Sequence, residues 1–435
     1  MQRDLIKSLK EWKNSKRRKP LILQGARQAG KTWLMQEFGK QEYQKTIYIT
    51  FDRNENLKKA FTDYTNIKEL ITKIEIDAQT KITPDDTLII FDEVQECPDA
   101  ITSLKYFNEK APELHIIAAG SLLGIAHHNG TGFPVGKVNF MTLYPLSFLE
   151  FLSANGEELL REAMEAGNID AVKTFSSKLI NYLKYYYYTG GMPEVVQSFV
   201  LNRDFKEVRQ IQEEIIASYN SDFSKHTDSN TAERIRMVWE SIASQLAKEN
   251  KKFIYNAIRT GARAKDFETA LSWLRDAGLV YKVTRISKPD LPIKAYEDID
   301  IFKLFVVDAG LLGALSNLSA KAIIEDNRIF TEFKGALTEQ YVFQQLKAAH
   351  NSIHYWVSRS NVAEVDFVVQ IEDYVIPIEV KAATNLKAKS LQQYRKDYNP
   401  EKAVRTSLAD FEVNNGLYNI PLYLIGLLDN LTNIR

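Results

Sequence analysis

One short pattern, G-x-x-x-x-G-K-T at Gly25–Thr32, constrains this chain more than any other feature of its sequence. The pattern lies between an apolar run, Leu21–Leu23, and a stretch with helical character, Trp33–Phe38. A P-loop requires this strand–loop–helix context. Its glycines let the backbone fold tightly with N–H groups turned towards phosphate oxygens, and the following helix N-terminus adds positive potential. A plain glycine turn beside a surface lysine is the alternative, and the coincidence of motif and context disfavours it.

Each position of the loop has an expected chemical role. Lys31 should reach the β- and γ-phosphates of a nucleotide, and the Thr32 hydroxyl should bind Mg²⁺. The sequence therefore predicts ATP or ADP as the ligand, with Mg²⁺ as its cofactor. The residues predicted to bind the nucleotide are Gly25, Ala26, Arg27, Gln28, Ala29, Gly30, Lys31, Thr32 and Trp33.

An acidic pair, Asp92 and Glu93, ends the apolar run Thr87–Phe91. A parallel strand that is buried on both faces requires such a continuous apolar run. In doubly wound sheets, ligands bind at the carboxyl ends of the strands. We therefore predict that Asp92 holds Mg²⁺ through water and that Glu93 is the general base for the attacking water. Without a P-loop, the same pattern would equally fit a strand followed by a solvated acidic turn.

A further apolar run, His115–Ala119, leads into Gly120 and Ser121. Its spacing after the acidic pair predicts a neighbouring strand whose end places the Ser121 hydroxyl beside the γ-phosphate. Taken alone, Gly-Ser after a strand indicates only a turn.

The middle of the chain reads as helical from Glu157 to about Ser224, with a break at Gly190–Pro193, and predicts a small helical lid. From Arg234 to about Leu315 the pattern resembles a winged helix, with helical segments near Val238–Glu249 and Tyr255–Arg259 and strands at Leu279–Ile286 and Lys303–Val307. A helix over Asp266–Ala277 is the expected recognition helix. The cations near that helix are Lys248, Lys251, Lys252, Arg259, Arg263 and Lys265. They could neutralise DNA phosphates. A solvated charged face or a protein-binding winged helix is slightly favoured, because 56 Lys and Arg balance 56 Asp and Glu.

The last part of the sequence carries a second set of acids. Glu339 lies on a predicted helix, Phe333–Phe343. Asp366 lies on one strand of a predicted hairpin, and Glu379 and Lys381 lie on the other. Residues two apart on a strand face the same side, so Glu379 and Lys381 should point together, and Asp366 can reach that side. This Asp…Glu-x-Lys pattern is similar to the PD-(D/E)xK nucleases, in which two carboxylates bind a divalent cation and a lysine orients water. An ordinary charged hairpin is the alternative.

Five segments in order extend the resemblance to nearly the whole chain: LILQGARQAGKT, TLIIFDEVQECPDAITSLK, HIIAAGSLLG, LYPLSFLEFL and YYTGGMPEVV. Together they resemble a bacterial and archaeal family of AAA-type ATPases fused to a nuclease-like C-terminal domain. The resemblance implies that Ser121 is the first-sensor residue and that Leu143–Leu152 packs the core onto the lid. Where that family usually has Gly-Arg, this chain has Gly136-Lys137, and a lysine lacks the fork of an arginine. Lys137 is therefore not expected to act as a catalytic finger.

These observations predict an α/β protein of four parts. They are a P-loop AAA-type ATPase core (residues 1–155), a helical lid (156–232), a winged-helix-like domain (233–325) and a restriction-endonuclease-like α/β domain (326–435). The single cysteine, Cys97, and a charged N-terminus without a secretory signal predict a cytoplasmic protein that makes no membrane contact. The oligomeric state stays open.

Two functions fit this organisation. In the first, ATP hydrolysis is coupled to binding or processing of DNA, with a second Mg²⁺ or a Mn²⁺ at Glu339, Asp366, Glu379 and Lys381. In the second, ATP switches an interaction with a protein partner, and the nuclease-like domain is an inactive scaffold. Both functions retain the nucleotide site at Gly25–Thr32.

Overall fold

The computed structural model describes residues 1–120, 133–248, 251–324, 331–350, 352–384 and 387–433. The chain divides into two compact units. The N-terminal unit comprises Gln2–Tyr144 with Asp276–Leu279, and the C-terminal unit comprises Pro145–Arg275 and Val280–Arg435, with Met1. Among the described residues, none of the helices combines the length and the apolar character that a bilayer crossing needs.

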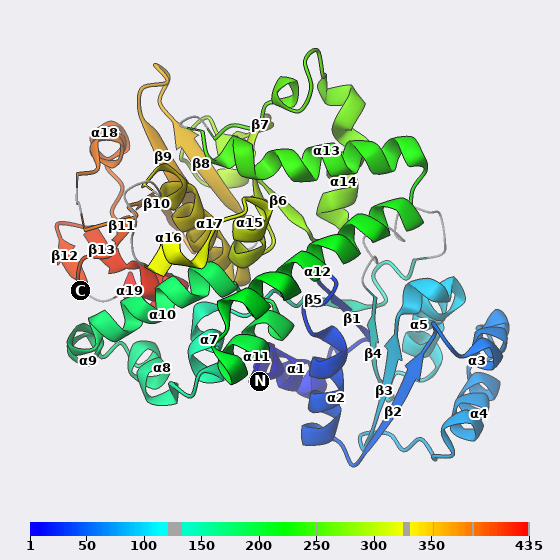
Figure 1. Cartoon of the computed structure of the whole chain (residues 1–435). Helices are drawn as coiled ribbons and strands as arrows, with labels where there is room; N and C mark the ends of the chain where they lie inside the picture. Colours follow the sequence, from blue (N-terminus) through cyan, green and yellow to red (C-terminus); the bar gives the residue numbers. More distant parts are fainter. Residues whose placement is uncertain (121–132, 249–250, 325–330, 351, 385–386, 434–435) are drawn as a thin grey trace. The chain divides into compact units, whose positions relative to one another are not determined.

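The N-terminal unit is built on a parallel sheet, drawn in blue and cyan in Figure 1. Within the described residues its spatial order is β2-β3-β4-β1-β5. Its strands are β1 (Leu21–Gln24), β2 (Lys45–Thr50), β3 (Thr87–Asp92), β4 (His115–Ala119) and β5 (Asn139–Thr142). Its helices are α1 (Leu5–Asn14), α2 (Lys31–Glu42), α3 (Glu55–Ala60), α4 (Ile67–Ala78) and α5 (Pro98–Lys110).

The central strands of this sheet are buried along their whole length. All residues of β3 and β4 are buried, as a parallel strand covered on both faces requires. Two hydrophobic clusters pack on the sheet, and α2 contributes Leu34, Met35 and Phe38 to one of them. The prediction of a buried apolar strand that ends in acids is therefore confirmed. β4 lies between β1 and β3, so the loop after β1 and the acids after β3 flank the end of one common neighbour.

The C-terminal unit begins with a run of helices. They are α7 (Phe148–Ala154), α8 (Glu158–Glu165), α9 (Ile169–Thr174), α10 (Ser176–Thr189), α11 (Pro193–Asn202), α12 (Phe205–Lys225), α13 (Ser229–Leu246) and α14 (Ala264–Asp276). The predicted break falls between α10 and α11, where Pro193 opens the new helix. The tyrosines of α10 serve packing, since Tyr186, Tyr187 and Tyr188 are buried and contact other aromatic rings.

The remaining helices of this unit are α15 (Ala309–Leu315), α16 (Ala320–Ile324), α17 (Thr331–Ala349), α18 (Lys389–Tyr398) and α19 (Leu428–Leu431). Its strands are β6 (Val280–Ile286), β7 (Glu297–Val306), β8 (Ile353–Val357), β9 (Glu364–Ile371), β10 (Tyr374–Val380), β11 (Ala403–Ser407), β12 (Glu412–Asn414) and β13 (Leu417–Pro421). In the described residues these strands form one mixed sheet in the order β12-β13-β11-β10-β9-β8-β6-β7.

This sheet runs across the boundary drawn from the sequence at residues 325 and 326. β6 and β7, the strands expected in a winged helix, pair with each other, and β6 also pairs in parallel with β8. The helix expected at Tyr255–Arg259 is only a short 3-10 turn, Tyr255–Ala257. Long-range strand pairing of this kind leaves no local sequence signal. The winged helix and the division of the chain into four domains therefore stay predictions.

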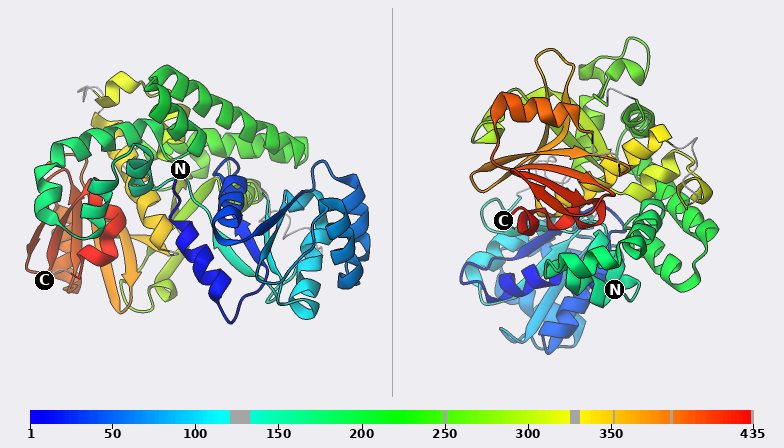
Figure 2. Two further views of the ribbon diagram at one scale, coloured as in Figure 1. Left: turned by 90° about the horizontal axis from the view of Figure 1, so that it is seen from below. Right: turned by 90° about the vertical axis from the view of Figure 1, so that its left-hand side faces the viewer.

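Helices cover the two faces of this mixed sheet differently. α18 packs on one face, where its Leu391 and Tyr394 join Trp356 and Val365. The 3-10 helix Leu422–Leu427, which precedes α19, contacts α17 on the opposite face of the orange and red strands (Figure 2). β9 carries one extra residue against β8, because Trp356 pairs with Val365 while His354 pairs with Val368. Such a bulge re-aims a side chain, and the extra residue falls at Asp366 or Phe367.

Candidate functional site

The loop at Gly25–Thr32 has the backbone geometry of a phosphate-binding loop. Gly25 has a φ of 146°, and a Cβ there would meet the carbonyl oxygen of Leu143 at 2.3 Å. Gly30 has a φ of 93° and stands immediately before α2. Both positions therefore require glycine, since a side chain would be strained at Gly30 and would also clash at Gly25. The loop then enters the helix N-terminus, whose free N–H groups favour anions.

Lys31 is held inside this loop by uncharged partners. Its Nζ donates hydrogen bonds to the carbonyl oxygens of Gly25 and Ala26 at 2.8 and 2.9 Å. Burial lowers the pKa of Lys31 to about 8, although Glu93 and Asp92 act against this shift. A buried ammonium group with neutral partners is under-compensated, so an anionic phosphate near it would be bound strongly.

Thr32 and Asp92 meet across the sheet edge. The Thr32 hydroxyl donates a hydrogen bond to Asp92 Oδ2 at 2.7 Å, and the Tyr48 hydroxyl donates to the same oxygen at 2.9 Å. Burial and the nearby Asp92 raise the pKa of Tyr48, which keeps its hydroxyl protonated. A hydroxyl and a carboxylate are the hard oxygen donors that Mg²⁺ takes in nucleotide sites. These two side chains therefore fit the metal ion expected from the sequence.

Glu93 follows β3 directly and has a φ of 51°, which is uncommon for a residue with a side chain. Its backbone N–H donates to Asp92 Oδ1 at 3.0 Å, which orients that carboxylate. Gln95 donates a hydrogen bond from Nε2 to Glu93 Oε2 at 2.5 Å. Backbone conformations of this kind gather at functional sites. The predicted partner Ser121 lies outside the described residues, so its placement by the γ-phosphate stays a prediction.

Three further residues that the sequence singled out near the loop are Trp33, Arg27 and Lys137. Trp33 is exposed on the first turn of α2. Arg27 lies close enough to Lys31 to contribute to its lowered pKa. Lys137 Nζ pairs with Glu109 Oε1 at 3.0 Å. The expectation that Lys137 is not a catalytic finger stays a prediction.

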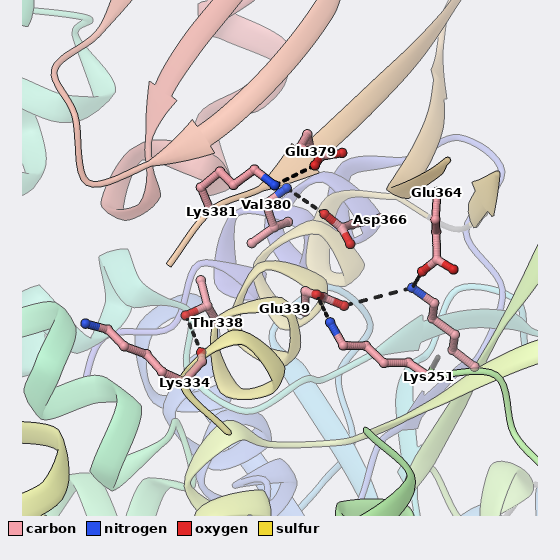
Figure 3. Close-up of polar contacts among 10 residues, drawn as sticks. Lys251, Lys334, Thr338, Glu339, Glu364, Asp366, Glu379, Val380 and Lys381 are labelled. Atoms are coloured by element: carbon pink, nitrogen blue, oxygen red, sulfur yellow. Dashed lines mark hydrogen bonds and ion pairs between the residues drawn. The ribbon is translucent and has the colours of Figure 1, made fainter. Parts of the chain in front are cut away.

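The C-terminal unit brings together the four residues that the sequence singled out there (Figure 3). Asp366 lies on β9 opposite Glu379 on β10, next to the register pair Phe367 and Ile378. Asp366 Oδ2 accepts a hydrogen bond from the Val380 backbone N–H at 2.8 Å. Lys381 Nζ pairs with Glu379 Oε1 at 2.7 Å. Glu339 reaches the cluster from α17, and its carboxylate contributes to raising the pKa of Asp366.

Two further lysines neutralise this cluster. Lys251 Nζ makes an ion pair with Glu339 Oε1. Lys303, which is fully buried on β7, pairs with Glu364 Oε1 at 2.5 Å and lies 3.9 Å from Glu339 Oε2. We name these seven residues the carboxylate–lysine cluster: Lys251, Lys303, Glu339, Glu364, Asp366, Glu379 and Lys381.

The acids of the carboxylate–lysine cluster differ in protonation. Burial alone would raise the pKa of Glu339, but the ammonium groups of Lys251 and Lys303 outweigh it, so this pKa lies below its usual value. Burial and the carboxylates of Glu339 and Glu379 raise the pKa of Asp366 well above its usual value. Burial also raises the pKa of Glu379, against the opposing effect of Lys381. Glu339 is therefore the acid that ionises more readily beside the lysines, and Asp366 is the acid that takes up a proton more readily.

Sequence reasoning missed Tyr48 and Lys303 and gave Lys251 another role. Tyr48 stands on β2, whose Thr50 pairs in register with Asp92, so the position of β2 beside the acidic strand is a signal that could have indicated it. Lys303 stands in an apolar strand and carried no such signal. Lys251 was grouped with cations that could meet DNA, but its partner is Glu339.

Three family models match successive parts of the chain. Residues 17–152 match a model described as an AAA domain. Residues 180–322 and 334–425 match two models that are each described as a domain of unknown function, DUF8612 and DUF4143. No curated protein matches the chain.

The solved structures that match the chain include three archaeal and bacterial proteins. A Walker-type ATPase of Pyrococcus abyssi has 14% sequence identity and a TM-score of 0.45, over 72% of this chain and 94% of that chain. The ORC1 protein of Aeropyrum pernix, in complex with DNA, has 12% identity and a TM-score of 0.27, over 72% and 90%. AMPPCP-bound DnaA of Aquifex aeolicus has 13% identity and a TM-score of 0.26, over 62% and 85%.

At these TM-scores the likenesses do not bear on function, and the family match and the loop geometry stand by themselves. The matched residues 17–152 contain the loop at Gly25–Thr32, Lys31 and the acidic pair after β3. The chain therefore contains an AAA-family ATPase domain in residues 17–152.

Proposed function

We propose that the chain binds ATP with Mg²⁺ at Gly25–Thr32 and hydrolyses it. The observation that carries this proposal is the short hydrogen bond of 2.7 Å between Thr32 Oγ1 and Asp92 Oδ2, beside the buried Lys31. Mg²⁺ bound there would neutralise charge on the phosphate oxygens. The loop N–H groups and Lys31 bind and orient the phosphates, and Asp92 and Thr32 hold the ion.

Glu93 is the proposed general base. Glu93 directly follows Asp92, the residue proposed to bind Mg²⁺. One of its carboxylate oxygens, Oε2, accepts a hydrogen bond from Gln95 Nε2. A carboxylate in that place can take a proton from the attacking water while the fixed donors of the loop hold the γ-phosphate. Lys31 balances the charge that develops on the transferred phosphate.

The test is ATP turnover with and without Mg²⁺, in the parent protein and in Asp92→Asn. Asn keeps the shape of the side chain but removes the negative charge that favours the ion. We expect turnover to require Mg²⁺ and to fall by about 10²-fold or more in Asp92→Asn, the usual scale for one lost electrostatic contribution to catalysis. Asp99→Asn, on the neighbouring helix α5, is the matched control and should keep the parent rate. Equal rates in both variants would refute the assignment of the site.

For the C-terminal unit we propose the second of the two functions, an interaction that the nucleotide state switches. The observation that favours it is the pairing of Glu339 with Lys251, because a lysine there competes with the metal ion that cleavage would need. The nucleic-acid function keeps some support, since Lys248, Arg259, Arg263 and Lys265 are exposed.

One experiment separates the two functions. ATP turnover is measured with and without duplex and single-stranded DNA, and strand nicking is followed in the same tube with Mg²⁺ or Mn²⁺. The switch function expects no nicking in any condition. Metal-dependent nicking that disappears in Glu379→Gln would reverse this choice and establish the nuclease function.

A further inference from the structure

The positive charges in the carboxylate–lysine cluster are the ammonium groups of its lysines. Glu339, Glu364 and Glu379 each have an ammonium group as a partner: Lys251, Lys303 and Lys381, respectively. Asp366 is the fourth acid, and one of its oxygens accepts the Val380 backbone N–H. Three carboxylates therefore face three ammonium groups, and Asp366 is the acid that takes up a proton more readily, because burial and the neighbouring carboxylates raise its pKa. The cluster thus supplies a cation to each paired carboxylate without any added ion.

A divalent cation does not fit this arrangement. Within the described parts of the chain, no three His, Cys, Asp or Glu side chains are grouped as ligands of a metal ion. Glu339 Oε1 is occupied by Lys251, and Glu339 Oε2 lies 3.9 Å from Lys303 Nζ. A dication placed among these acids would lie beside the ammonium groups of Lys251 and Lys303, and the full burial of Lys303 weakens the screening of that repulsion.

Two oxygens nevertheless indicate that a cation could be accepted. Glu339 Oε2 and Glu379 Oε2 are buried without a hydrogen-bond partner, on side chains that are 5% and 4% exposed. Buried carboxylate oxygens normally have a donor or a metal ion as a partner. In Figure 3 the side chains of Glu339 and Glu379 lie on either side of Asp366, with Lys251 on the side of Glu339.

We propose that Lys251 takes the place of a divalent cation in this cluster, so that the cluster excludes metal ions while Lys251 is present and binds one when it is removed. Of the two lysines near Glu339, Lys251 is the replaceable one. Its side chain is 17% exposed and enters from the segment after α13, which is not part of the sheet. Lys303 is fixed on β7, with its Nζ 4.8 Å from the centre of the Tyr355 ring.

The test is Mn²⁺ binding without nucleotide, measured by calorimetry and by the electron paramagnetic resonance signal of free Mn²⁺. Lys251→Met removes the charge and keeps the length of the side chain. We expect Lys251→Met to bind one Mn²⁺ more per chain than the parent protein. That extra ion should be lost in the double variant Lys251→Met, Glu339→Gln. Lys248→Met, at an exposed lysine of the same segment, should bind Mn²⁺ as the parent does.

Three results would overturn the proposal. One is a folded Lys251→Met protein that binds no extra Mn²⁺. Another is the extra ion persisting in the double variant, which places it elsewhere. The third result can be obtained even if Lys251→Met fails to fold. The parent protein, Glu339→Gln and Asp366→Asn should all bind the same number of Mn²⁺ ions. If either variant binds one ion fewer than the parent, the parent cluster already binds metal. Because nucleotide is absent, none of these results depends on ATP hydrolysis.

Discussion

Both units of this chain hold a lysine close to acidic side chains, yet the hydrogen-bond partners of the two lysines differ. In the N-terminal unit, Lys31 donates to the carbonyl oxygens of Gly25 and Ala26. In the C-terminal unit, Lys251 pairs with the carboxylate of Glu339. The first lysine has neutral partners and the second has a charged one. This difference decides whether the positive charge is available to an anionic ligand.

The pKa values follow the partners. Burial lowers the pKa of Lys31 to about 8, since its neutral partners do not compensate the charge. Burial acts in the same direction on Lys251, but Glu339 and Asp366 outweigh it and raise its pKa above the usual value. A buried cation with a carboxylate partner is already satisfied, and removing one partner of such a pair is costly. The same residue type thus serves ligand binding in one unit and internal neutralisation in the other.

The largest expected effect concerns ATP hydrolysis at the site in the N-terminal unit. Glu93→Gln removes the proposed base while Asp92 and Thr32 stay in place. We expect ATP to bind with parent affinity and to turn over at least ~10²-fold more slowly, the scale of a lost general base. Glu96→Gln, an exposed neighbour, is the control. A near-parent rate for Glu93→Gln in single-turnover assays would assign the base to another residue.

The second effect separates the two central acids of the carboxylate–lysine cluster. Glu339→Gln leaves Lys251 without its charged partner, so we expect a loss of about 3 kcal/mol in the free energy of unfolding. Asp366→Asn imitates the protonated acid and keeps an acceptor for Val380, so its loss should be below about 1 kcal/mol. Urea unfolding near neutral pH measures both. Equal losses would contradict the assignment of the proton to Asp366.

The contributions of Asp366 and Glu339 to stability should change in opposite directions as the pH rises. The folded-state pKa of Asp366 lies above its unfolded value, so its contribution lowers stability as pH rises from the unfolded pKa through the folded one. The folded-state pKa of Glu339 lies below its unfolded value, so its contribution is present above the unfolded pKa and is lost as pH falls through the folded one. Asp366→Asn should remove only the first slope from a plot of stability against pH.

The third effect concerns Lys31, whose positive charge is available to an anionic ligand. Lys31→Ala removes the ammonium group that faces the phosphates, and a hydrogen bond to a charged group contributes about 1.5–3 kcal/mol. We therefore expect the Kd for ATP to rise by roughly 10- to 150-fold in equilibrium binding. Lys40→Ala lies at an exposed position of the same helix and should bind ATP as the parent does. Unchanged affinity in Lys31→Ala would refute the P-loop assignment.

The smallest effect is a pH dependence of binding. The pKa of Lys31 is about 8 without phosphate, and a bound phosphate raises it, so binding takes up a proton above that pH. ATP affinity should therefore fall by about tenfold between about pH 7 and about pH 9. Lys31→Arg stays charged over this range and should bind with a flatter profile. An equally steep profile in Lys31→Arg would assign the proton to another group.

Much of both sites could be predicted from short stretches of sequence. The P-loop, the buried strand before Asp92 and the alternation of Glu379 with Lys381 all depend on residues close together in the chain. The predicted strand His115–Ala119 has the same bounds in the structure as β4. The ends of elements were less certain, because capping and strand pairing decide them: α17, for example, begins before and ends after the predicted segment Phe333–Phe343.

The parts that escaped prediction depend on pairing between distant segments. Lys251 and Glu339 are 88 positions apart, and Tyr48 and Asp92 are 44 apart. The pairing of β6 with β8 joins regions that the composition and the motifs divided. A periodic pattern shows which face of an element is apolar, but it does not show which other element covers that face.

The sequence by itself determined the residues that can bind phosphate and those that can carry negative charge. Glycine at Gly25 and Gly30, with Lys31 and Thr32 after them, defines a loop whose geometry is local to the backbone. Only the tertiary structure decided the charge balance of each site. Compensation between charges depends on distance and burial, and β7 and the segment after α13 set both for Lys303 and Lys251. The acids of the two units therefore look alike in the sequence and differ in the cations that the fold places beside them.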